Sequence, residues 1–132
     1  MSAGAREELS RMIDTIERSY EFMLAYAAQG RDSEPSSGDG PGIRTFVTEL
    51  VEAIACLPEQ LESIEPAETE LKKRVGDFGE TIAQDCEKAN RAARVVLASP
   101  VISSQLIDNL NASVHLRTLL TDLFIIDEAL PR

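Results

Sequence analysis

Apolar side chains recur along this chain at steps of three and four residues, which is the period of an α-helix. No stretch alternates strictly between apolar and polar residues, so the pattern predicts no strand. A first helix is predicted over residues 5–29, where Glu and Arg spaced four residues apart support the polar side. Its apolar face comprises Leu9, Ile13, Ile16, Tyr20, Met23 and Ala27.

Residues 30–42 interrupt this pattern and are rich in Gly, Pro, Ser and Asp. Such a segment cannot bury apolar area, so it is predicted to be a flexible linker. Its glycines do not form a phosphate loop, because no strand precedes them and no Gly-Lys-Ser/Thr follows. The second helix is predicted to begin at Pro41, which suits a first helical turn. From Pro58 onward, residues 58–65 either continue this helix with a kink or form a separate short helix.

A third helix is predicted from Pro66 to about residue 98. Gly76 and Gly79 lie inside it, and each lowers helix stability by ~1 kcal/mol relative to Ala. These glycines either let another helix approach closely or are merely tolerated. We favour close approach.

Ser99 followed by Pro100 is typical of an N-cap and a first helical residue, which predicts a fourth helix that reaches residue 130. The third and fourth helices are then joined by a very short turn and must lie antiparallel. The sequence therefore predicts an all-α fold, an antiparallel four-helix bundle with up-down topology. A chain of 132 residues is expected to form one domain.

The predicted fourth helix carries two apolar stripes, although a helix in a simple four-helix bundle needs only one. One side comprises Ile102, Leu106, Leu110, Val114, Leu120 and Phe124. The opposite side, spaced as a heptad seam, comprises Ala112, Leu116, Leu119, Leu123, Ile126 and Leu130. Either this helix lies centrally within one chain, or the second stripe is an interface with another copy, which is the interpretation that we favour.

Two aromatic residues of the first helix extend this interpretation. Phe22 and Tyr26 lie off the main apolar stripe, near the end of that helix. An arrangement that pairs two helices from each of two chains would bury them together with the second stripe. The sequence therefore predicts a homodimer whose interface includes both aromatic side chains.

The composition narrows the classes of partner. The net charge is −10, from 13 Lys plus Arg against 23 Asp plus Glu, and it disfavours binding to nucleic acid or to an anionic membrane. Cys56 and Cys86 lie 30 residues apart without a paired motif, which indicates reduced thiols rather than a disulfide framework or a zinc site. The charged N-terminal stretch does not have the pattern of a signal peptide, and no apolar run is long enough to span a membrane. The expected location is the cytoplasm.

His115 is the only histidine, so a di-iron bundle with two Glu-x-x-His motifs is excluded. A phosphotransfer role for His115 would need a Lys and a Gly soon after it, and the sequence HLRTL has neither. We therefore expect His115 to form an ordinary hydrogen bond at the margin of the second stripe. Arg117 and Thr121 interrupt the inner side of the same helix, and an ion pair from Arg117 to a neighbouring helix is the simplest explanation.

These patterns predict a non-catalytic, acidic protein without cofactors that self-associates and acts by binding protein. Leu116, Leu119, Leu123 and Ile126 are the expected interface anchors. The alternative is a ligand-binding or enzymatic bundle, in which Arg117 and Thr121 converge with Tyr20 or Tyr26 on a small anion. A phosphotransfer module that uses His115 is the third hypothesis.

Overall fold

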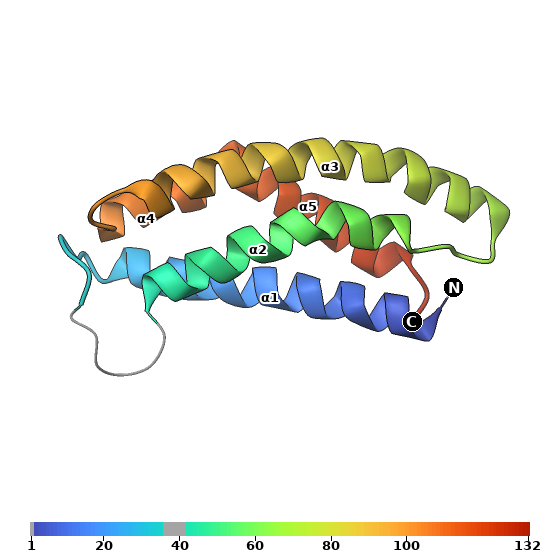
Figure 1. Ribbon diagram of the computed structural model, residues 1–132, viewed down its shortest axis with the longest axis horizontal. Coiled ribbons are helices and arrows are strands. Elements are labelled where there is room, and N and C mark those ends of the chain that lie inside the picture. Colours follow the sequence, from blue (N-terminus) through green and yellow to red (C-terminus); the bar gives the residue numbers. More distant parts are fainter. Residues whose placement is uncertain (1, 36–41) are drawn as a thin grey trace.

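A computed structural model describes residues 2–35 and 42–132 of the chain, which form five helices. Their bounds are α1 Ala3–Ala28, α2 Ile43–Glu62, α3 Thr69–Ala98, α4 Ser104–Ala112 and α5 Val114–Ala129. Helix α2 packs between α1 and α3, whereas α4 and α5 pack against both α1 and α3. Neighbouring long helices run in opposite directions (Figure 1). The prediction of an all-α chain with antiparallel helices is confirmed, but the helices number five.

Helices α1 and α3 lie close to their predicted positions, with small corrections at their starts. The Ser2 side chain accepts a hydrogen bond from the Ala5 backbone N–H at 3.4 Å and caps α1. Helix α3 begins after Glu68 rather than at Pro66, because the Glu68 carboxylate accepts the backbone N–H groups of Glu70 and Leu71. The capping hydrogen bonds of Glu68, rather than Pro66, therefore determine where α3 begins.

Helix α2 continues through Pro58 to Glu62, so the first alternative for residues 58–65 holds as far as Glu62. Ser63 is its C-cap, and no separate helix follows before α3 begins. The predicted start at Pro41 and residues 36–41 of the predicted linker lie outside the described residues. Gly30, which follows α1, has a φ of 63° and turns the chain away from that helix.

The prediction that a helix begins at Ser99 and Pro100 is wrong. The N-cap of α4 is Ser103, whose side chain accepts the backbone N–H of Leu106 at 3.1 Å. The chain is held away from helical geometry before this point by Arg44 of α2. Its guanidinium donates to the carbonyls of Leu97 at 3.0 Å, Ser99 at 2.9 Å and Pro100 at 3.1 Å. The carbonyls at the end of α3 are satisfied in this way.

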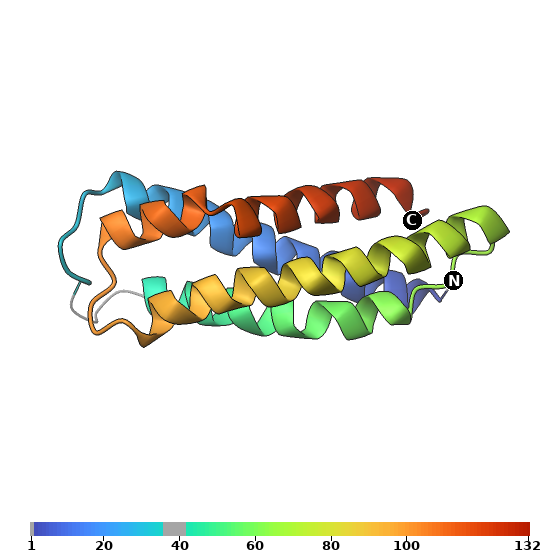
Figure 2. The same ribbon diagram turned by 90° about the horizontal axis from the view of Figure 1, so that it is seen from above.

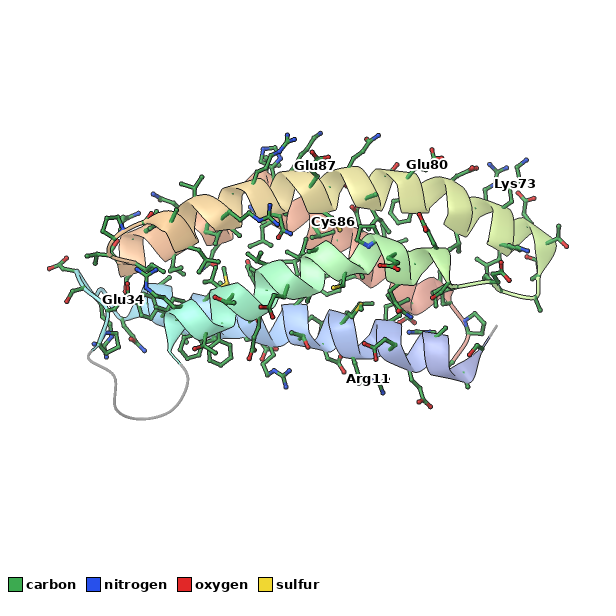
Figure 3. The ribbon with its side chains drawn as sticks, in the orientation of Figure 1. Arg11, Glu34, Lys73, Glu80, Cys86 and Glu87 are labelled. Carbon is green, nitrogen blue, oxygen red and sulfur yellow. The ribbon has the colours of Figure 1, made fainter. Side chains whose placement is uncertain are left out.

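The same end of the molecule is closed by Glu34, which follows α1. Its carboxylate pairs with Arg44 at 2.7 Å and accepts the backbone N–H of Ile102 at 2.9 Å. The hydrogen bond from Arg44 is the main reason that the pKa of Glu34 is lowered. Figure 3 shows Glu34 at the end of the molecule where the α1–α2 and α3–α4 connections meet.

The predicted fourth helix is divided at Ser113. This residue has φ −57° and ψ 126°, so the backbone leaves the helix for one residue between α4 and α5. The break rotates the buried side of the chain: Ile107 and Leu110 are buried on α4, whereas Leu116 and Leu119 begin the buried face of α5. The predicted single helix with two apolar stripes is therefore two helices, each of which buries one side.

The predicted interface stripe lies inside the chain. Leu116, Leu119, Leu123, Ile126 and Leu130 are each at most 3% exposed, whereas Ala112 is exposed. The prediction that these five residues form an interface with another copy is therefore wrong. Val114 and Phe124, which were assigned to the inner side, are instead 65% and 54% exposed. The alternative, in which this helix lies centrally within one chain, holds only for the heptad seam, because the opposite side of α5 is exposed.

The two termini lie at the same end of the molecule (Figure 2). There, the Arg6 guanidinium of α1 donates to the Asp127 carboxylate at 2.8 Å and to the Asp127 carbonyl at 3.0 Å. It also donates to the Pro131 carbonyl at 3.3 Å, so one buried side chain holds the end of α5 against α1. In residues 2–35 and 42–132, no helix is both long and apolar enough to cross a membrane.

Candidate protein-binding surface

The side of α5 that faces away from the core carries the most exposed apolar side chains of this helix. Seven exposed positions lie there: Val114, Arg117, Thr118, Thr121, Phe124, Ile125 and Glu128. At about 100° per residue they fall within an arc of about 120°, and we refer to them as the outer face of α5. Val114 is 65% exposed, and Phe124 and Ile125 are each 54% exposed. A surface helix usually places such residues on its buried side.

An open groove of about 460 Å³ lies at the beginning of this face, next to the break at Ser113. It is lined by Ala112, Val114, Arg117, Thr118, Thr121 and Asp122. The Thr121 hydroxyl donates to the Arg117 carbonyl at 3.1 Å. The groove therefore combines apolar side chains, one cation and one carboxyl group.

Asp122 lies at the edge of the outer face and is only 7% exposed. Its Oδ2 atom has no hydrogen-bond partner among the residues that the structure describes. Burial, followed by a hydrogen bond and charge repulsion from Asp85 of α3, raises the pKa of Asp122 from 3.8 to about 7. Two carboxyl groups from α3 and α5 therefore meet and favour a shared proton.

The structure brings together only part of the predicted anion pocket. Arg117 and Thr121 both line the groove, but Tyr20 and Tyr26 of α1 do not. Tyr26 is buried, and its hydroxyl donates to the Ile102 carbonyl at 2.6 Å, where it ties α1 to the start of α4. The Asp122 carboxyl in the groove further disfavours a small anion. The prediction that Tyr20 or Tyr26 converges with Arg117 and Thr121 on a small anion is therefore wrong.

The two aromatic residues expected at a dimer interface also pack within the chain. The Phe22 ring of α1 stacks on the Phe46 ring of α2, with 4.0 Å between centroids and 10° between planes. Tyr26 is 2% exposed. The sequence predicted that both residues extend a dimer interface, because they lie off the main apolar stripe of the first helix. Their packing within the chain does not support this prediction.

The remaining candidate residues are exposed or buried as follows. His115 is exposed on the second residue of α5, and its phosphotransfer role stays a prediction. Arg117 is exposed and has no ion pair within the described ranges, so the prediction of an internal salt bridge is wrong. Cys86 is buried and points to the inside of the molecule (Figure 3), whereas Cys56 is exposed. The part of the chain that the structure describes contains no cluster of three or more potential metal-ligating side chains.

Comparisons with models of known protein families, with curated proteins and with solved structures find no match for this chain. Its function must therefore be inferred from its own surfaces. The sequence pattern missed the outer face because it placed Phe124 and Val114 on the buried side. Ile125 belonged to neither predicted stripe, and such an isolated large apolar residue is the signal that could have revealed this face.

Proposed function

We propose that this chain is a non-catalytic protein that acts by binding protein and that it associates with other copies through the outer face of α5. The supporting observation is the exposure of Val114, Phe124 and Ile125 on one side of a single helix. Contiguous exposed apolar side chains are typical of interaction sites, whereas isolated ones are ordinary. Phe124 and Ile125 lie next to each other and replace the buried leucines as the proposed anchors.

The charge distribution supports this choice of surface. The chain carries a net charge of −10, yet the outer face has one cation, Arg117, and one anion, Glu128, which are eleven residues apart. Protein interfaces are depleted of charge at their centre and keep it at the rim. The outer face has this arrangement, because the apolar anchors and two threonines lie between the two charges.

The proposed architecture explains how this face is presented. We describe the chain as an up-down four-helix bundle in which α4 and α5 together occupy the fourth position. Because the opposite side of α5 is packed with buried leucines, the outer face is held on a rigid element, which reduces the entropy lost on binding. Two free cysteines fit a cytoplasmic location for such a protein, where thiols stay reduced.

The test combines Phe124→Glu and Ile125→Glu in one variant. Both side chains are exposed, so the variant is expected to keep the helicity and unfolding midpoint of the wild type and to lose self-association. Val95→Glu is the matched control, because Val95 of α3 is 66% exposed and lies outside the outer face. Light scattering should give the double variant the monomer mass of 14.5 kDa and leave the control unchanged relative to wild type. Equal association of all three proteins would contradict the proposal.

A further inference from the structure

A groove runs between α2 and α3 and consists of two adjoining hollows of about 420 and 280 Å³. The hollows share Pro58 and Ala83, so they form one continuous depression, which we call the α2–α3 groove. It extends along α3 from Val75 to Arg94, a length of about 28 Å at 1.5 Å per residue. This length is sufficient for several turns of another helix.

Small side chains on α3 create this groove. The residues at its floor recur at steps of three and four: Gly76, Gly79, Ala83, Cys86 and Asn90. A Cβ atom added to Gly76 or Gly79 would meet nothing within 4 Å, and neither has a positive φ. The close approach of another helix of this chain, favoured from the sequence, is therefore wrong. The fold does not need these glycines, although each lowers helix stability relative to Ala.

Asn90 is a buried polar residue beneath the groove. This side chain lines the larger hollow and is only 7% exposed. Its Nδ2 donates to the Val51 carbonyl of α2 at 3.2 Å, but its Oδ1 is buried and has no donor among the described residues. Buried carboxamide oxygens are normally hydrogen-bonded, so this oxygen is an unsatisfied acceptor beneath the surface of the groove.

The two ends of the groove carry opposite charges. Glu62 and Glu80 line the end near the glycines, and neither forms an ion pair in the described part of the chain. Arg91 and Arg94 line the other end. Arg91 pairs with Glu87 on the same helix, whereas Arg94 has no ion-pair partner in residues 2–35 and 42–132. An occupant that is basic at one end and acidic at the other would match this pattern.

We propose that the α2–α3 groove receives the outer face of α5 from a second copy of this chain. This inference rests on the proposed function and identifies the surface that the outer face contacts. Arg117 and Glu128 are eleven residues apart on α5, about 16 Å along the helix, and Glu80 and Arg91 have the same spacing on α3. With α5 of one copy parallel to α3 of the other, Arg117 faces Glu80 and Glu128 faces Arg91.

Shape complements charge in this arrangement. The bulky side chains of Phe124 and Ile125 lie between Arg117 and Glu128 and would occupy the depression above the small residues of α3. Filling such a trough with large apolar side chains is the usual way in which an amphipathic helix docks in a groove.

The two surfaces lie on different sides of one chain. Helix α5 packs on α3 and α1, and α2 lies on the far side of the molecule from α5 (Figures 1 and 2). The contact is therefore heterologous: each copy donates α5 to one neighbour and accepts α5 from another. Successive copies add until a ring closes, or they continue as an open chain.

Charge reversal tests this pairing. The variants are Arg117→Glu on the outer face and Glu80→Arg in the groove, together with the double variant. Each single variant is expected to associate with itself about tenfold more weakly, because like charges then face each other. An equimolar mixture should recover the wild-type affinity for one contact, and the double variant should recover self-association. Sedimentation velocity at several concentrations measures each mass, and circular dichroism checks that each protein is folded.

The outcomes separate this inference from the proposed function. Weakening by Arg117→Glu without any effect of Glu80→Arg, and without rescue in the double variant, would keep the outer face as an interface and overturn its docking in the groove. Association unaffected by both variants would overturn docking in the groove. If the Phe124→Glu/Ile125→Glu variant also associated as strongly as wild type, the proposed function would be overturned as well. Gly79→Leu gives a second test. The open space at this position accepts the leucine side chain, which then occupies the groove and should abolish association. Unchanged association of that variant would also contradict the inference.

Discussion

The Arg6 guanidinium, near the start of α1, lies 2.8 Å from the Asp127 carboxylate near the end of α5. The Arg6 side chain is only 6% exposed, and it also donates to the carbonyls of Asp127 and Pro131. We predict that Arg6→Met destabilises the protein by about 2–4 kcal/mol, because the variant leaves partly buried acceptors without this donor. Urea unfolding followed by circular dichroism measures the loss.

Arg11→Met is the matched control for this prediction. Arg11 pairs with Glu8 on the same helix, but their side chains are 64% and 43% exposed, so the control should change stability by less than about 0.5 kcal/mol. Equal effects of the two substitutions would show that burial of the Arg6–Asp127 pair contributes nothing to stability.

The Asp85–Asp122 contact predicts how stability depends on pH. The pKa of Asp122 is raised in the folded protein to about 7, so this group binds a proton in the folded state over a range of pH in which the unfolded chain has released it. Its contribution to stability is therefore fully present below about pH 4 and is lost as the pH rises through about 7. Asp122→Asn, which cannot ionise, should be more stable than wild type by about 1–3 kcal/mol at pH values above 7.

The comparison requires the difference between the two proteins at each pH, because other carboxyl groups also titrate. Urea unfolding from acidic to mildly basic pH should show that the advantage of Asp122→Asn grows with pH and then levels off above about 7. Parallel pH profiles for Asp122→Asn and wild type would contradict the shared proton between Asp85 and Asp122.

The glycines of the α2–α3 groove predict opposite effects of the same substitution at different positions. Gly79→Ala should stabilise the protein by about 1 kcal/mol, because α3 gains helix propensity and the added Cβ meets nothing within 4 Å. Gly30→Ala should instead destabilise it by about 1 kcal/mol, since Gly30 has a φ of 63°. Thermal or urea unfolding of both variants measures whether each substitution stabilises or destabilises the protein. Destabilisation by Gly79→Ala would mean that a contact at this position is tighter than the structure shows.

The two cysteines should react with a thiol reagent at very different rates. Cys56 is exposed, whereas burial raises the pKa of the Cys86 thiol to about 12, with smaller effects from Asp85 and Asp122. One thiol per chain should therefore react in the native protein, and the second only after unfolding. Mass spectrometry of the labelled peptides identifies the modified residue. Rapid labelling of Cys86 in the native protein would contradict the burial of this α3 side chain.

Much of the fold follows from local patterns in the sequence. The spacing of apolar residues located α1, α2 and α3, because a helix that packs on others buries one regular face. Leu9, Ile13 and Ile16, for example, were assigned to the core and are at most 1% exposed.

The break at Ser113 could not be predicted in this way, because serine is common inside helices and no glycine or proline marks the position. Without it, a single helix appeared to have two apolar stripes. The late start of α4 depends on contacts of Ile102 and the end of α3 with Glu34 and Arg44, which are distant in the sequence. The pKa of Asp122 is raised first by burial and then by Asp85 on another helix, and both causes depend on how the helices pack.

The solution mass of the wild-type protein, measured by light scattering after size exclusion, tests the central claim most directly. Two loading concentrations, about 10 μM and about 500 μM, span the affinities expected for a small, partly polar interface. We predict a mass above 14.5 kDa that increases with concentration. A mass of 14.5 kDa at both concentrations would contradict self-association through the outer face of α5.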